Sequence, residues 1–158
     1  RESCIHTVAR RVARYYPYLG CEYAIEQLPE GRLLDAALRT TIDEWTENDP
    51  EMALAWAESR QTVHRRDHAF SVIAMTLVDE DDPGNAAAVA TMMTPGEQRD
   101  SVLRNAIEEW GDSDPDIAAE WAAELEDGAI RTIVMETLAE YMEPDSDDEP
   151  EPEPDVEE

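Results

Sequence analysis

Two stretches of the sequence, LRTTIDEWTENDPEMALAWA at residues 38–57 and LRNAIEEWGDSDPDIAAEWA at residues 103–122, are copies of one another. Ten of their twenty positions are identical, and three more exchange Asp for Glu, without a gap and at an offset of 65 residues. Agreement over so many positions indicates an internal repeat, which is the sequence signature of a protein built from stacked copies of one small unit.

Two residue types show that the repeating unit has about half that length. Prolines recur at intervals of 33, 33 and 32 residues, at Pro17, Pro50, Pro83 and Pro115. Arginines mark the other joint of each unit, at Arg32, at Arg65 or Arg66, at Arg99 and at Arg131. The unit therefore consists of a helix of about 15 residues, an Asp-Pro joint, a helix of about 11 residues and a short turn with glycine.

The Asp-Pro joint has the chemistry of a helix start. Three of the four prolines follow an aspartate, namely Asp49, Asp82 and Asp114. Aspartate is a preferred N-cap because its carboxylate accepts a hydrogen bond from a backbone N–H that the helix leaves free. Proline at the first helical position loses no hydrogen bond, and it disfavours helix in the residue before it. Each joint therefore ends one helix and begins the next.

The apolar residues follow the period of an α-helix. In the second unit the positions i, i+4, i+8 and i+11 are occupied by Leu34, Leu38, Ile42 and Trp45. In the second helices of two units, alanines flank Trp56 and Trp121, so that helices can approach closely while the indole fills the remaining space. Because all four tryptophans recur with the repeat, we expect them in the core.

These patterns predict an all-α protein, a right-handed α-solenoid of about four antiparallel helical hairpins plus a capping helix. We expect helices at residues 3–16, 18–28, 32–47, 50–60, 64–79, 84–93, 96–111, 115–126 and 129–142. The helical-repeat domain is expected to cover residues 1–142. A disordered acidic tail is expected at 143–158, because alternating Glu and Pro residues repel one another and cannot build a core.

The repeating unit, in the order Arg, Ala or Leu, Trp, Asp-Pro, Ala, Trp-Ala and Leu, resembles the helical hairpins of α-solenoids of the tetratricopeptide or HEAT-like kind. It is also similar to hairpin repeats in uncharacterised bacterial proteins, and the resemblance covers residues 1–142. The unit lacks the Leu-Gly pair of tetratricopeptide repeats and the Thr-Pro-Leu-His of ankyrin repeats. The resemblance implies a binding or scaffolding role, with no catalytic residues to carry over.

The chain has a net charge of −27, from 39 acidic residues against 12 Arg and no Lys. Such a surface disfavours DNA or RNA as a partner, because contacts to phosphate need patches of Lys or Arg. No uninterrupted apolar run reaches about 18 residues, so we expect no membrane insertion. Two origins of the acidity stay open, namely adaptation to high salt or a GC-rich genome combined with one acidic tail.

The two cysteines bear on the cellular compartment. Cys4 and Cys21 are expected near opposite ends of one hairpin, which is too far apart for a disulfide. Free thiols favour a reducing compartment, so a cytoplasmic location is expected. Export after removal of a signal is the alternative, because the chain begins at Arg1 rather than Met.

The sequence offers little for catalysis or metal binding. His64 and His68 lie one helical turn apart, a spacing that can hold Zn²⁺, but the pattern is not HExxH and no third His or Cys is nearby. We therefore expect an exposed helix start there, with no metal or other cofactor. The sequence contains no nucleophile elbow, phosphate-binding loop or dinucleotide fingerprint. We expect that the protein is not an enzyme.

Residues that do not recur are the better candidates for binding, since recurrence is explained by packing. Arg10, Arg11 and Arg14 crowd the first helix, and Tyr15 and Tyr18 follow directly. Arg and Tyr are enriched at protein interfaces. The alternative is a solvated face in which these arginines pair with local glutamates.

The expected function is a non-catalytic protein–protein interaction or scaffold module, which binds a peptide or protein on a face of the solenoid. The stacked second helices would offer that partner a shallow concave surface. The alternative is a structural or regulatory segment of a longer or cell-surface polypeptide with no ligand of its own. A further hypothesis is head-to-tail self-association, with the acidic tail of one copy on the Arg-rich first helix of another.

If the acidity is an adaptation to salt, KCl will raise the thermal unfolding midpoint strongly, because ions screen the repulsion among carboxylates. Melting followed by circular dichroism between about 0.1 M and about 1 M KCl measures this effect. A midpoint that does not rise strongly with KCl would contradict salt adaptation.

Overall fold

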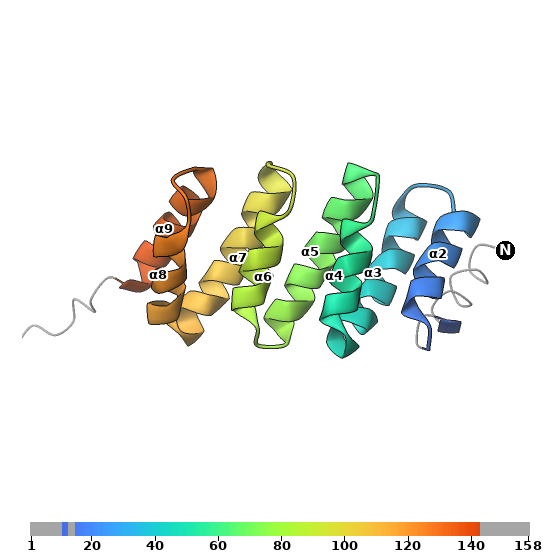
Figure 1. Ribbon diagram of the computed structural model, residues 1–158, viewed down its shortest axis with the longest axis horizontal. Helices are drawn as coiled ribbons and strands as arrows, with labels where there is room; N and C mark the ends of the chain where they lie inside the picture. Colours follow the sequence, from blue (N-terminus) through green and yellow to red (C-terminus); the bar gives the residue numbers. More distant parts are fainter. Residues whose placement is uncertain (1–10, 13–14, 143–158) are drawn as a thin grey trace, which may run out of the picture.

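The computed structural model describes residues 11–12 and 15–142, and within that part of the chain the protein is entirely α-helical (Figure 1). Its eight numbered helices are α2 (Pro17–Gln27), α3 (Arg32–Asn48), α4 (Pro50–Glu58), α5 (Val63–Asp79), α6 (Pro83–Thr91), α7 (Glu97–Ser113), α8 (Pro115–Glu124) and α9 (Ala129–Met142). The predicted all-α class and the absence of strands are confirmed for this part of the chain.

The helix boundaries lie within two residues of those expected from the sequence. The predicted first helix, 3–16, lies outside the described residues except for Arg11 and Val12, which are helical, and the turn residues at 15–16. The predicted acidic tail, 143–158, lies outside them as well. The structure thus contains three complete hairpins, the second helix of a preceding one, and the single helix α9. The right-handed sense of the stack stays a prediction.

The Asp-Pro joints are built as the sequence indicates. The carboxylate of Asp49 accepts a hydrogen bond from Met52 N at 3.1 Å, Asp82 accepts one from Asn85 N at 3.3 Å, and Asp114 accepts one from Ile117 N at 3.4 Å. The other joint needs a glycine in front of α3, where Gly31 has φ +132°, a conformation that side chains with a Cβ rarely adopt. Both joints thus reverse the chain for local chemical reasons.

The helices form two layers of unequal packing (Figure 1). The long helices α3, α5, α7 and α9 contact one another in succession, and each short helix packs on the long helices next to it in sequence. The short helices α2, α4, α6 and α8 make at most marginal contact with each other. These helices form a row whose members are held mainly by the long helices, and the expectation that they offer a partner a shared concave face stays a prediction.

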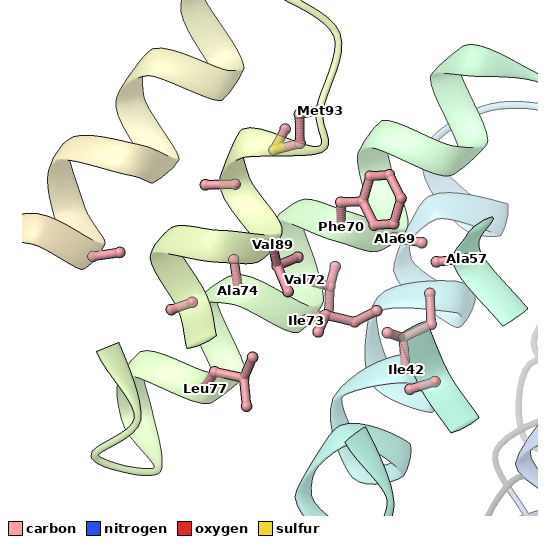
Figure 2. Packing of buried hydrophobic residues seen from close by; sticks show 14 of the residues in the cluster. Ile42, Ala57, Ala69, Phe70, Val72, Ile73, Ala74, Leu77, Val89 and Met93 are labelled. Atoms are coloured by element: carbon pink, nitrogen blue, oxygen red, sulfur yellow. The ribbon is translucent and has the colours of Figure 1, made fainter. Parts of the chain in front are cut away.

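The core runs along the whole row of hairpins as one cluster. Its largest fully buried side chains include Phe70, Leu38, Ile42, Ile73 and Leu103. Figure 2 shows Ile42, Phe70 and Ile73 gathered with Ala57 and Ala69 where α3, α4 and α5 meet. The alanines permit close approach of the helices, and the larger side chains fill the space that remains.

The four tryptophans form two pairs, one within each of two hairpins. The ring centroids of Trp45 and Trp56 are 6.1 Å apart, and those of Trp110 and Trp121 are 5.5 Å apart, both with tilted planes. Trp45 and Trp56 are buried, whereas Trp110 and Trp121 are half-buried against the core. The prediction that the tryptophans serve packing is confirmed, fully for the first pair and in part for the second.

Replacement of Asp49, Asp82 and Asp114 by Ala is expected to lower the free energy of unfolding by about 1 kcal/mol each, because a backbone N–H then loses its cap. The three sites lie in separate hairpins, so their effects are expected to add. Chemical denaturation of the single and triple variants measures the losses.

The corresponding Asp→Asn variants are the matched control, because Asn removes the same charge and still caps a helix. Equal losses in the Ala and Asn series would show that charge, rather than capping, explains the effect.

Candidate functional site

The predicted Arg/Tyr binding residues lie at the start of the described chain. Arg10 and Arg14 lie outside the described residues, and Arg11 is exposed. Tyr15 and Tyr18 are 75% and 53% exposed. The structure thus leaves these tyrosines available for contact, and their binding role stays a prediction.

Tyr15 borders a hollow of about 670 Å³ between the start of α2 and the end of α3. Its other lining residues are Pro17, Glu44, Trp45, Glu47, Asn48 and Asp49. Most of these side chains are polar or charged, and Asp49 is already engaged as the cap of α4. This hollow therefore offers a partner few apolar contacts.

His64 and His68, whose spacing could hold a zinc ion, both lie next to Asp35 of α3. His64 Nε2 lies 3.9 Å from the Asp35 carboxylate, and His68 Nε2 donates to the Asp35 carbonyl oxygen at 3.2 Å. No group of three or more His, Cys, Asp or Glu side chains comes together as a metal site within residues 11–12 and 15–142. The pair thus ties α5 to α3, and His68 is half-buried in that contact.

Of the two cysteines predicted to be free thiols, Cys21 lies in the described part of the chain, where it is a free thiol fully buried in α2. Burial raises the pKa of the Cys21 thiol to about 12, and the neighbouring Glu22 carboxylate adds to the rise. Only thiolates are nucleophiles, so this side chain serves the core as a small apolar group. Cys4 lies outside the described residues.

A polar cluster lies between the short helices α2 and α4, beside a hollow of about 320 Å³ that Glu22 and Arg60 help to line. Trp56 Nε1 donates to Glu22 Oε1 at 2.9 Å, and the Arg60 guanidinium donates to the same oxygen at 2.7 Å. The guanidinium also lies 4.5 Å from the centroid of the Trp56 ring. This arrangement joins a cation–π contact to an ion pair, and it covers the core where the two short helices diverge.

The space between α6 and α8 is occupied by the second tryptophan pair. Gly84, at the start of α6, lies so close to Trp110 that an added Cβ would stand 3.2 Å from the indole. Trp110 in turn packs on Trp121 of α8. The indole pair therefore bridges α6, α7 and α8.

The space between α4 and α6 is different, because the third hairpin lacks both tryptophans. One repeat of 33 residues places Val78 at the position of Trp45 and Val89 at the position of Trp56. An open groove of about 300 Å³ lies there. It is lined by Pro50, Glu51, Leu54, Ile73, Leu77, Asp82, Asn85, Ala88, Val89 and Met92. We name these residues the α4–α6 groove.

The α4–α6 groove combines an apolar floor with an acidic rim. Ile73 and Leu77 of α5 form the floor beneath Leu54 and Val89, while Glu51 and Asp82 are the charged residues of the lining. Both Asp82 oxygens accept hydrogen bonds from Asn85, so this carboxylate is held in place. Such a site can bury an apolar side chain and accept hydrogen bonds from a donor at its edge.

The α4–α6 groove is not among the predicted binding residues, although a sign of it is present in the repeat. The two valines are visible once the four units are aligned by their prolines. What could not be read from one sequence is that the tryptophans fill the spaces between successive short helices, because that depends on how the hairpins are stacked. Only with this packing known does a missing indole indicate an opening.

None of the described helices is both long enough and apolar enough to cross a bilayer. In comparisons with known proteins, the chain matches no family model, no curated protein and no solved structure. The fold class, an all-helical arrangement of sequential hairpins, therefore comes from the structure itself.

Burial lowers the pKa of His68 below its ordinary value, although its hydrogen bond to Asp35 works in the opposite direction. The folded state then binds fewer protons than the unfolded chain, so stability is full above about pH 6.5 and falls as the pH drops through the lowered pKa. We expect His68→Gln to show a smaller fall in unfolding midpoint between pH 7.5 and 5.5 than the wild type.

His64→Gln is the control, because His64 is largely exposed and its loss leaves the buried imidazole in place. Calorimetry at both pH values gives the midpoints. An undiminished fall in His68→Gln would show that other groups cause the pH dependence.

Proposed function

We propose that the chain is a non-catalytic interaction module that binds a protein or peptide partner on the face formed by its short helices. We further propose that its hairpins are α-solenoid repeats of the tetratricopeptide or HEAT-like kind, in keeping with the 33-residue unit and the sequential pairing of helices. In such repeats, a surface that extends over several units is the usual place for a partner.

The observation that carries the proposal is the α4–α6 groove. The two neighbouring spaces differ from it: Trp110 and Trp121 pack together between α6 and α8, and the hollow of about 320 Å³ beside Arg60, between α2 and α4, is lined mainly by polar and charged side chains. The middle space instead holds a groove with a mainly apolar lining, in which Ile73 and Leu77 of α5 are buried at the floor and Met92 is 41% exposed at the edge. Apolar surface in a concave site favours association, because its burial releases the water that covers it.

The surroundings of the groove suit a partner rather than a packing defect. Met92, which lines the groove at its edge, is 41% exposed. Methionine side chains are flexible and polarizable, which lets them adapt to the shape of a bound side chain. The groove thus lies beside a surface that can extend the contact beyond one anchoring residue.

Val89→Trp tests this proposal by restoring the indole of the other hairpins and filling the groove. Short peptides selected from a random displayed library on the wild-type protein are expected to bind Val89→Trp at least about tenfold more weakly, because the anchor side chain loses its site. Fluorescence anisotropy with the labelled peptides measures the affinities.

Two further variants make the result decisive. Ala88→Trp places the indole at an exposed position of the groove, so it serves if Val89→Trp disturbs the core. Met75→Trp is the matched control, because Met75 is 47% exposed on α5 but does not line the groove. Selected peptides that bind all three variants equally well would contradict binding in the groove.

A further inference from the structure

We propose that the α4–α6 groove binds a peptide segment in which an apolar side chain is flanked by arginine or lysine. This inference rests on the proposed function and names the partner chemistry of the same site. The apolar floor supplies the place for the anchor, and the acidic rim selects the charge of the flanking residues. Each of these two features makes a separate contribution to recognition.

The rim carries charge of one sign. Glu51 at the start of α4 and Asp82 at the start of α6 are the ionisable residues that line the groove. Glu51 is exposed, and its carboxylate accepts no hydrogen bond from the described residues. Asp82 is oriented by Asn85 at 2.8 Å. These two carboxylates lie at the starts of the two short helices that border the groove, where they can receive cationic groups beside an anchor.

The two helices that border the groove reinforce this charge. Neither α4 nor α6 contains Arg or Lys. The turn that joins α5 to α6 continues with Asp79, Glu80, Asp81 and Asp82, also without a base. A cationic segment laid along this face therefore meets attraction along its length, whereas an acidic segment meets repulsion.

The arginines in residues 67–142 do not neutralise the negative charge of the groove's rim. Residues 67–142 contain 18 acidic residues and three arginines. Arg99 is engaged with Asp100 at 2.6 Å, and Arg131 is engaged with Asp127 at 2.9 Å. Neither pair belongs to the groove, and neither does Arg104, so the charged residues that line it are Glu51 and Asp82 alone. The groove is therefore expected to repel acidic partners and to attract basic ones.

Three synthetic peptides test the inference, all with the same leucine anchor and flanked by Arg, Gln or Glu. We expect the Arg peptide to bind most tightly and the Glu peptide most weakly. Fluorescence anisotropy at about 0.1 M and about 1 M KCl measures binding, and the preference for Arg over Gln is expected to shrink at the higher salt.

A variant without charge at the rim tests whether the preference for the Arg peptide arises at the groove. We expect Glu51→Gln with Asp82→Asn to weaken binding of the Arg peptide about tenfold and to leave the Gln peptide unchanged, since each exposed carboxylate contributes about threefold. Asn at position 82 keeps the cap of α6. The control is Glu136→Gln with Glu140→Gln on α9, which removes the same charge far along the stack and is expected to weaken binding less than twofold.

The possible outcomes separate this inference from the proposed function. If Val89→Trp and Ala88→Trp weaken all peptides but the Arg and Gln peptides bind equally, the groove binds peptides and the charge preference is overturned. If the rim and α9 variants weaken the Arg peptide equally, the attraction belongs to the whole acidic chain, which also overturns the inference. If the groove-filling variants change nothing, the proposed function itself fails.

Discussion

The spacing of the short helices depends on what the side chains beneath them can fill. The long helices pack on each other directly, whereas successive short helices make at most marginal contact with each other. Trp110, which Gly84 admits, packs on Trp121 between α6 and α8, and Trp56 donates to Glu22 between α4 and α2. The junction of α4 and α6 lacks these indoles, and its groove has the mainly apolar lining that the hollow beside Arg60 lacks.

The charge of the chain is not explained by the needs of its helices. Acidic residues in the first turn, such as Glu51 and Asp116, agree with the helix dipole. The last turns of α2 to α9 contain no basic residue, although a cation is favoured there. Glu58 and Glu124 even end α4 and α8 with an anion. The acidity therefore acts against local helix stability, and its use must be sought in the solvent or in a partner.

The repeat made most of the fold predictable, because the joints are local. An Asp followed by Pro specifies a cap and a helix start whatever the tertiary structure, and the caps at Asp49, Asp82 and Asp114 form as expected. The ties between hairpins were not predicted. Their partners lie about one repeat apart, as in His68 with Asp35, Thr76 with Asp43 and Trp56 with Glu22. A period of 33 residues brings such positions side by side, but which of them interact depends on side chains that do not recur.

Two places depart from the repeat, the hollow beside Tyr15 and the α4–α6 groove, and the chemistry of their linings decides which of them suits a partner. The hollow beside Tyr15 is lined largely by polar and charged groups, so a partner there would exchange hydrogen bonds with water for others of similar strength. The lining of the α4–α6 groove is mainly apolar, and its exposed apolar side chains, such as Ala88 and Met92, can be removed from water without any such exchange. Charge at its rim, from Glu51 and Asp82, would then favour a cationic segment over an acidic one. A site of this kind gains affinity from the missing indoles and specificity from the acidic rim, and both come from the same hairpin junction.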